Sequence, residues 1–156
     1  MLEIRTLTVA DADQYIALRR LALASDPSSF AYTPEDDPNL KIEVVRKRLS
    51  AADTADGPFV IGALDPELVG VIGVIRESDD TARLWWMYVQ PAGRGKGTGR
   101  LLLRESLRLA RGLPGVRTIV LSVARTAEAA ISLYASEGFR TSKEDEVSLE
   151  MTLEGA

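Results

Sequence analysis

The pattern of apolar and polar positions along the chain predicts an alternating series of strands and helices. Apolar residues alternate with polar ones, or form short continuous runs, in segments that predict strands at 3–8, 57–64, 67–77, 81–89, 116–123, 139–143 and 146–153. Apolar residues recur at helical spacing in segments that predict helices at 11–25, 40–51, 97–111 and 126–139. The segment 26–39 holds three prolines and a cluster of acidic residues, which predicts a surface loop.

The order of these elements predicts the fold class. The strands at 57–64, 67–77 and 81–89 are separated by short polar turns, which favours antiparallel pairing. A helix separates 81–89 from the strand at 116–123, so the default connection is a right-handed parallel crossover. We therefore expect an α/β (α+β) fold: a mixed, mostly antiparallel sheet of six or seven strands with about four helices on both faces. The length of 156 residues predicts one domain, 1–156.

Local signals refine these elements. Thr8 with Asp11 three residues later predicts an N-cap and capping box for the first helix. Thr126 predicts the cap of the last helix, and Gly138 follows its end. Strict alternation along 81–89 divides that strand into two faces, predicting Leu84, Trp86 and Tyr88 on one side and Trp85, Met87 and Val89 on the other.

Composition narrows the chemistry that is possible. The chain has no cysteine and no histidine, which excludes disulfides, thiolate nucleophiles and the commonest neutral-pH base and metal ligand. We expect no metal cofactor. A net charge of −4 argues against general nucleic-acid binding. No leader and no apolar run of membrane-spanning length stand out, so the expected location is cytoplasmic, with neither a membrane nor a nucleic acid as partner.

The segment "QPAGRGKGTGRLLL" at 90–103 combines glycines and cations between a predicted strand and a predicted helix. A phosphate-binding P-loop requires Ser or Thr after Gly-Lys, whereas Gly97 follows Lys96. The dinucleotide fingerprint requires a third glycine where Thr98 or Arg100 stands. What remains is a basic turn whose backbone N–H groups, at a helix start, can hold a phosphate or diphosphate. The alternative is a flexible connection that happens to be basic.

Two stretches together resemble a known family. Val89 to Leu103 resembles the acetyl-CoA-binding motif of the GNAT family of N-acetyltransferases, [QR]-x-x-G-x-[GA], which is satisfied by Arg94, Gly97 and Gly99. The family's second signature, a helix with A-x-x-L-Y followed by G-F, is matched by Ala130, Leu133, Tyr134, Gly138 and Phe139. The resemblance implies a GNAT-like sheet that splays open between its fourth and fifth strands.

The resemblance also implies roles for particular residues. Acetyl-CoA would lie with its diphosphate against the glycine turn and its pantetheine arm along the backbone of the fourth strand. The cofactor-binding residues implied are Met87, Tyr88, Val89, Arg94, Gly95, Lys96, Gly97, Thr98, Gly99 and Arg100. The backbone N–H of Val89 would polarise the thioester oxygen, and Tyr134 would donate a proton to the departing thiolate. The alternative for Tyr134 is a packed core aromatic, because it continues an apolar helical stripe.

Two departures from the family pattern affect the site. Ala127 stands where the family usually has an asparagine, and 81–89 contains no glutamate that could serve as the base, so the base is unassigned. Glu35, Asp36 and Asp37 are candidates for binding a cationic acceptor, since the family's acceptor site often borders this loop. The alternative is a solvated acidic loop. The short connection at 142–146 predicts an open acceptor site.

The resulting hypothesis is transfer of an acetyl group from acetyl-CoA to a primary amine of an unidentified acceptor, by direct attack. The alternative is a non-catalytic acyl-CoA-binding or sensing module of the same fold. A third possibility, a nucleic-acid or other phosphate-binding domain, is opposed by the acidic net charge. The expected partner is an amine-bearing acceptor, and the C-terminal strand could support a homodimer.

Overall fold

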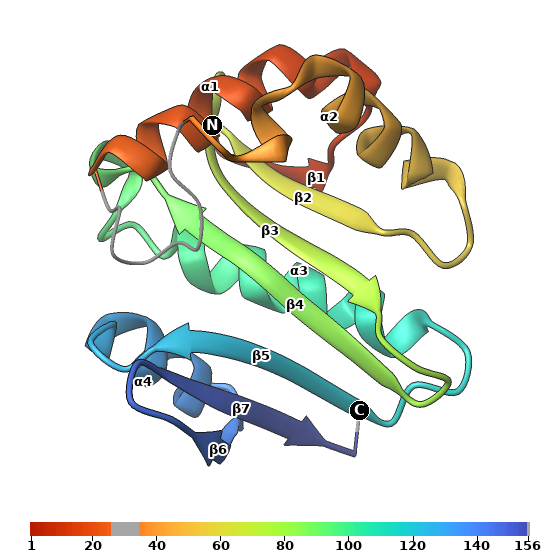
Figure 1. Cartoon of the computed structure of the whole chain (residues 1–156), viewed down its shortest axis with the longest axis vertical. Coiled ribbons are helices and arrows are strands. Elements are labelled where there is room, and N and C mark those ends of the chain that lie inside the picture. The colour runs from red at the N-terminus through yellow and green to blue at the C-terminus, as the bar shows by residue number, and fades with distance from the viewer. Residues whose placement is uncertain (26–34, 156) are drawn as a thin grey trace.

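The computed structural model describes residues 1–25 and 35–155 as a seven-stranded sheet with helices on both faces (Figure 1). The strand order is β1-β2-β3-β4-β5-β7-β6. The strands are β1 (Glu3–Thr6), β2 (Phe59–Leu64), β3 (Leu68–Arg76), β4 (Thr81–Val89), β5 (Thr118–Ala124), β6 (Arg140–Glu144) and β7 (Ser148–Glu154). The α-helices are α1 (Ala12–Ser25), α2 (Ile42–Leu49), α3 (Thr98–Gly112) and α4 (Glu128–Ser136). The predicted fold class is confirmed.

The sheet divides where β4 meets β5, its one parallel pair of strands. The two strands pair only from Thr81–Arg83 to Thr118–Val120, although β4 continues to Val89. β5 instead pairs along its whole length with β7. Figure 1 shows β5, β7 and β6 separating from β4 beyond the shared end. The opening expected between the fourth and fifth strands is therefore present.

A β-bulge interrupts β4 immediately after its pairing with β5 ends. Trp85 pairs with Gly73 and Tyr88 pairs with Val71, so two residues of β4 oppose a single residue of β3. Trp86 takes up the extra length with a φ of 54°, in the left-handed region that aromatic residues rarely adopt. The Trp85 ring covers Gly73 so closely that no room is left for a Cβ at that position.

The bulge corrects the predicted faces of this strand. The side chains of the strand now divide into two groups: Trp85, Trp86 and Tyr88 pack with α1 and α2, whereas Leu84, Met87 and Val89 pack with the core beneath α3. The prediction was wrong for Leu84 and Trp85, because strict alternation holds only for an uninterrupted strand. Two adjacent indoles consequently lie on the α1/α2 side of the sheet.

The predicted helix starts are partly corrected. The Thr8 N–H donates to the Asp11 carboxylate at 2.8 Å, as expected, but the turn it opens is a short 3-10 segment before α1. The N-cap of α4 is Ala127 rather than Thr126. The Ala127 carbonyl accepts the helical hydrogen bond from Ile131 at 3.0 Å, so the helix begins one residue later than the Thr126 signal predicts.

Two adjacent leucines of α3 provide a matched test of the core. Leu102 is fully buried against the sheet and Leu101 is 44% exposed. We expect Leu102→Ala to lower the free energy of unfolding by about 2–5 kcal/mol, because it leaves a cavity in the core. Leu101→Ala should cost less than about 1 kcal/mol. Urea denaturation of both variants measures this, and equal losses would contradict the described packing of α3.

Candidate functional site

A cavity of about 1150 Å³ occupies the opening between β4 and β5. Its walls come from both faces of the sheet: the turn before α3 on one side, and Arg19 of α1 and Arg48 of α2 on the other. β5 and α4 form the opposite wall. Because the two strands stop pairing after Arg83, the cavity passes through the plane of the sheet rather than lying on one face of it.

The glycine turn forms one end of this cavity. Gly95 and Gly97 both have a φ of 77°, a conformation that side chains disfavour, and a Cβ at either position would meet no atom within 4 Å. Gly97 is the N-cap of α3 and has no side chain to accept from the first turn. The fifteen-residue helix α3 therefore presents N–H donors and the positive end of its dipole at an open turn. This arrangement suits a phosphate or diphosphate.

The structure separates the predicted cofactor residues into two groups. Most of them line the cavity: Met87, Tyr88, Val89, Arg94, Gly95, Gly97, Thr98, Gly99 and also Tyr134. Lys96 and Arg100 do not. Lys96 is exposed on the turn, where it contributes positive charge without forming a wall.

Arg94 connects the turn to the end of β4. Its Nε donates to the Val89 carbonyl at 2.9 Å, and its guanidinium lies 5.7 Å from the centre of the Tyr88 ring. The strand register also fixes the direction of the Val89 N–H group. Gln90 N–H donates to Val69 across the pair Gly70–Val89, so the N–H of Val89 itself points away from β3, toward the opening. A backbone donor is thus available where sequence reasoning expects one.

Tyr134 is both a packed aromatic and a wall of the cavity. Its side chain is 6% exposed, its ring meets Phe139 edge-on with 6.0 Å between centroids, and its hydroxyl donates to the Met87 sulfur at 3.5 Å. Burial raises the pKa of Tyr134 to about 12. Complete proton transfer from the Tyr134 hydroxyl to a thiolate, whose conjugate thiol has a pKa of ~8.5, is therefore uphill by roughly 5 kcal/mol. The hydroxyl is suited to donating a hydrogen bond to a developing thiolate rather than to releasing its proton first.

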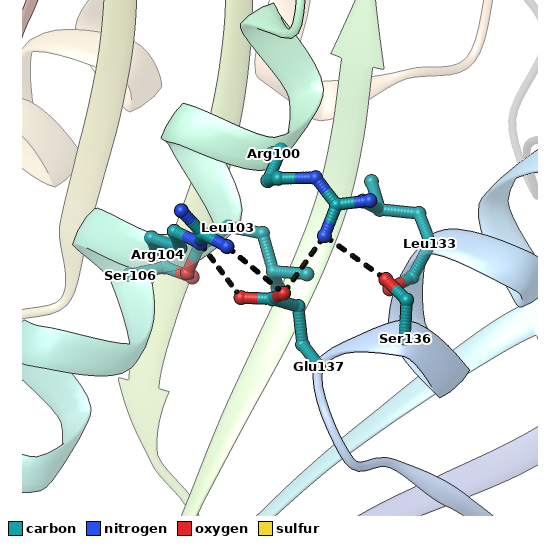
Figure 2. Close-up of polar contacts among 7 residues, drawn as sticks. All are labelled: Arg100, Leu103, Arg104, Ser106, Leu133, Ser136 and Glu137. Carbon is teal, nitrogen blue, oxygen red and sulfur yellow. Dashed lines mark hydrogen bonds and ion pairs between the residues drawn. The ribbon is translucent and has the colours of Figure 1, made fainter.

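Arg100 contacts α4 rather than the glycine turn (Figure 2). Its Nη1 donates to Glu137 at 2.8 Å and to the Ser136 hydroxyl at 3.0 Å. Arg104 donates to the same carboxylate at 2.9 Å. The Arg104 and Arg100 guanidinium groups hold the pKa of Glu137 below its usual range. This cluster joins α3 to the end of α4, three residues after Tyr134.

The predicted acidic acceptor residues lie outside the cavity wall. Asp37 is buried, where it accepts from Arg19 Nε at 2.5 Å and from the Asn39 N–H at 2.9 Å. Glu35 and Asp36 are exposed and do not line the cavity. Their role in binding an acceptor stays a prediction, and Asp37 is placed to support Arg19 instead.

Sequence reasoning missed the residues that line the cavity on the α1/α2 side of the sheet. Arg19, Asn39 and Arg48 line the cavity together with both tryptophans of the bulge. Arg19 carried a usable signal, because it lies four residues after Tyr15 and four before Leu23, within the buried stripe of α1. A charged residue at such a position requires a partner, which here is Asp37.

Two further observations concern catalysis. Among the described lining residues, the single carboxylate is Glu128, in the first turn of α4. Ala127, at the N-cap, provides no side-chain acceptor for that turn.

Within 1–25 and 35–155, no group of three or more acidic, histidine or cysteine side chains is close enough to hold a metal. None of the described helices is long and apolar enough to cross a membrane.

The sequence is similar to those of known acetyltransferases. Residues 17–139 match the acetyltransferase (GNAT) family. An L-2,4-diaminobutyric acid acetyltransferase from Nocardia farcinica is 36% identical over 83 residues, which cover 51% of this chain and 42% of that protein. The chain thus matches less than half the length of this curated relative.

Solved structures share the fold at low sequence identity. A GNAT acetyltransferase from Streptococcus pneumoniae superposes with a TM-score of 0.80 at 20% identity, over 100% of both chains. The PaiA N-acetyltransferase from Thermoplasma acidophilum, solved in complex with coenzyme A, gives 0.78 at 22% identity over 99% of each chain.

The Glu137 cluster predicts a specific pH dependence. A lowered pKa means that the contacts of Glu137 contribute stability above the ordinary carboxyl pKa of about 4.5 and lose it as the pH falls through the folded-state value. The stability difference between the wild type and Glu137→Gln should therefore be largest near pH 7 and should shrink toward pH 3. Urea denaturation across this range measures it.

Glu105→Gln is the matched control, because the partner of Glu105 is Arg108 on the same helix. Only Glu137→Gln should increase hydrogen exchange of the α4 amides. Equal exchange in the two variants, or a stability difference that is independent of pH, would contradict the role of the cluster in holding α4.

Proposed function

The chain belongs to the acetyltransferase (GNAT) family, and from this we propose that it transfers the acetyl group of acetyl-CoA to a primary amine by direct attack. The observation that carries the proposal is the cavity through the sheet. It joins the open glycine turn on one face to the end lined by Arg19 and Arg48 on the other. A donor and an acceptor entering from opposite faces would meet beside Val89 and Tyr134. We also infer that residues 1–156 act as one acetyltransferase domain, because a single sheet contains both β1 and β7.

The residues present suit acetyl-CoA as co-substrate. The uncapped turn at Gly95–Gly99 has room and N–H donors for a diphosphate. The edge of β4 beyond Arg83 is not paired with β5, so the peptide groups from Met87 to Val89 can pair with an extended amide-containing arm. Arg94 fixes the turn to that edge.

Each protein group has one part in the proposed step. Val89 N–H donates to the thioester oxygen as negative charge develops there. Tyr134 donates a hydrogen bond to the sulfur as the carbon–sulfur bond breaks and the carbon–nitrogen bond forms. An amine with a pKa of ~10.4 must lose one proton to attack and a second as the amide forms; the second can end on the CoA thiolate, and we assign no residue as the base for the first. Water in the open cavity can carry that proton.

Similarity to an enzyme named for 2,4-diaminobutyric acid favours a small-molecule acceptor. The second candidate function is a non-catalytic acyl-CoA-binding or sensing module. Ala127 in place of a polar residue, and the absence of a carboxylate from the sequence of β4, favour this second candidate.

Binding and turnover measured together decide between these functions. Calorimetry with acetyl-CoA should show binding, and release of the CoA thiol should follow addition of a primary amine from a panel that includes 2,4-diaminobutyrate. Binding without thiol release from any amine would favour the binding module. Thermal stabilisation by an oligonucleotide but not by acetyl-CoA would overturn both.

Replacing Tyr134 with phenylalanine tests the donor role directly. Loss of the hydroxyl should lower kcat by about a hundredfold, because one positioned hydrogen-bond donor to a developing negative charge contributes roughly 10²–10³. The affinity for acetyl-CoA should stay within about twofold, since the ring remains packed on Phe139. Thiol release and calorimetry measure the two quantities, and unchanged turnover would remove Tyr134 from the mechanism.

A further inference from the structure

The end of the cavity on the α1/α2 side has a distinct chemistry. Two guanidinium groups lie over the two indoles that the bulge places side by side. Arg19 is 4.1 Å from the ring centre of Trp86, and Arg48 is 5.4 Å from that of Trp85. These contacts hold both arginines against the wall of the cavity and away from free rotation in solvent.

The charges lining the cavity are strongly unequal. The described lining residues include four arginines, at 19, 48, 83 and 94, and one carboxylate, Glu128 on the α4 wall. Arg83 is paired with Glu77 and Glu150, and Arg19 is paired with Asp37. Arg48 has no carboxylate partner among the described residues. This end of the cavity therefore carries excess positive charge, which opposes a cationic ligand and favours an anionic one.

Asn39 adds an unsatisfied acceptor at the same end. Its Nδ2 donates to Asp37 at 3.3 Å, which orients the amide, since the reverse orientation would oppose two oxygens. Within the described part of the chain, its buried Oδ1 has no hydrogen-bond partner. A buried carbonyl without a partner is costly, and a small movement of the Asn39 side chain toward the cavity that it lines would let a ligand N–H satisfy it.

We propose that the acceptor is a small amine that also carries a carboxylate, as an amino acid does. Arg48 binds the carboxylate through its planar guanidinium, and Asn39 Oδ1 accepts from an N–H of the acceptor. Arg19, buried and held by Asp37 and by the Tyr15 hydroxyl, keeps this wall of the cavity rigid. This inference rests on the proposed transferase function and specifies its acceptor.

Matched acceptors that differ only in the carboxylate test the inference. Alanine, ornithine and lysine are compared with ethylamine, 1,4-diaminobutane and 1,5-diaminopentane. We expect kcat/KM to be about ten- to a hundredfold higher for a carboxylated member than for its counterpart, the range of one charge-assisted contact. Equal or better use of the decarboxylated amines would overturn the proposal.

Arg48→Ala should remove most of this preference, because it should lower kcat/KM for a carboxylated acceptor far more than for its decarboxylated counterpart. The matched control is Arg46→Ala, which removes the same charge from an exposed position of α2 that does not line the cavity. Arg46→Ala should retain the preference. Similar behaviour of the two variants would show that the carboxylate is not bound at Arg48.

Calorimetry with the CoA-loaded protein separates this inference from the proposed reaction. If a carboxylated member binds in preference to its counterpart but no acetyl group is transferred, the binding site is supported and the transferase proposal fails. If neither member of any pair binds, or if the decarboxylated amines bind equally well, the acceptor inference fails, even where another amine releases CoA thiol.

Discussion

The central constraint on this protein is the short pairing between β4 and β5. Three residue pairs join the strands, and beyond Arg83 the backbone of β4 has lost its neighbour on one side. Arg83 secures the junction, since its guanidinium donates to Glu77, to Ser122 of β5 and to Glu150 of β7. The sheet therefore stays continuous at one end and open at the other, which gives a rigid frame around a cavity that reaches both faces.

The bulge determines which side chains β4 presents on the α1/α2 side of that frame. An uninterrupted strand would place Trp85 and Trp86 on opposite faces, whereas the left-handed backbone at Trp86 places both on the α1/α2 side. Each indole then supports one guanidinium. Backbone geometry in the strand and electrostatics in the cavity are in this way two aspects of one local irregularity.

The sequence predicts the parts of the fold that depend on local pattern. The element order, the basic glycine turn and the position of Tyr134 all follow from periodicity or motif spacing within a few residues. The bulge was missed because "LWWMYV" is apolar at every position, so alternation gives no sign of where the register changes. The partners of Arg19 and Arg100 were missed because Asp37 and Glu137 lie 18 and 37 residues away and meet them only after the sheet has formed.

The open glycine turn has a further consequence if the chain binds acetyl-CoA as proposed. Its N–H groups are already oriented by α3, so binding a diphosphate there requires little rearrangement. Free CoA, the product, contains the same diphosphate as acetyl-CoA, so this contact stabilises the bound substrate and the bound product equally. The turn can therefore contribute affinity for both molecules, but it cannot distinguish acetyl-CoA from CoA. That distinction depends on the few groups around Val89 and Tyr134, and free CoA should compete with acetyl-CoA throughout the reaction.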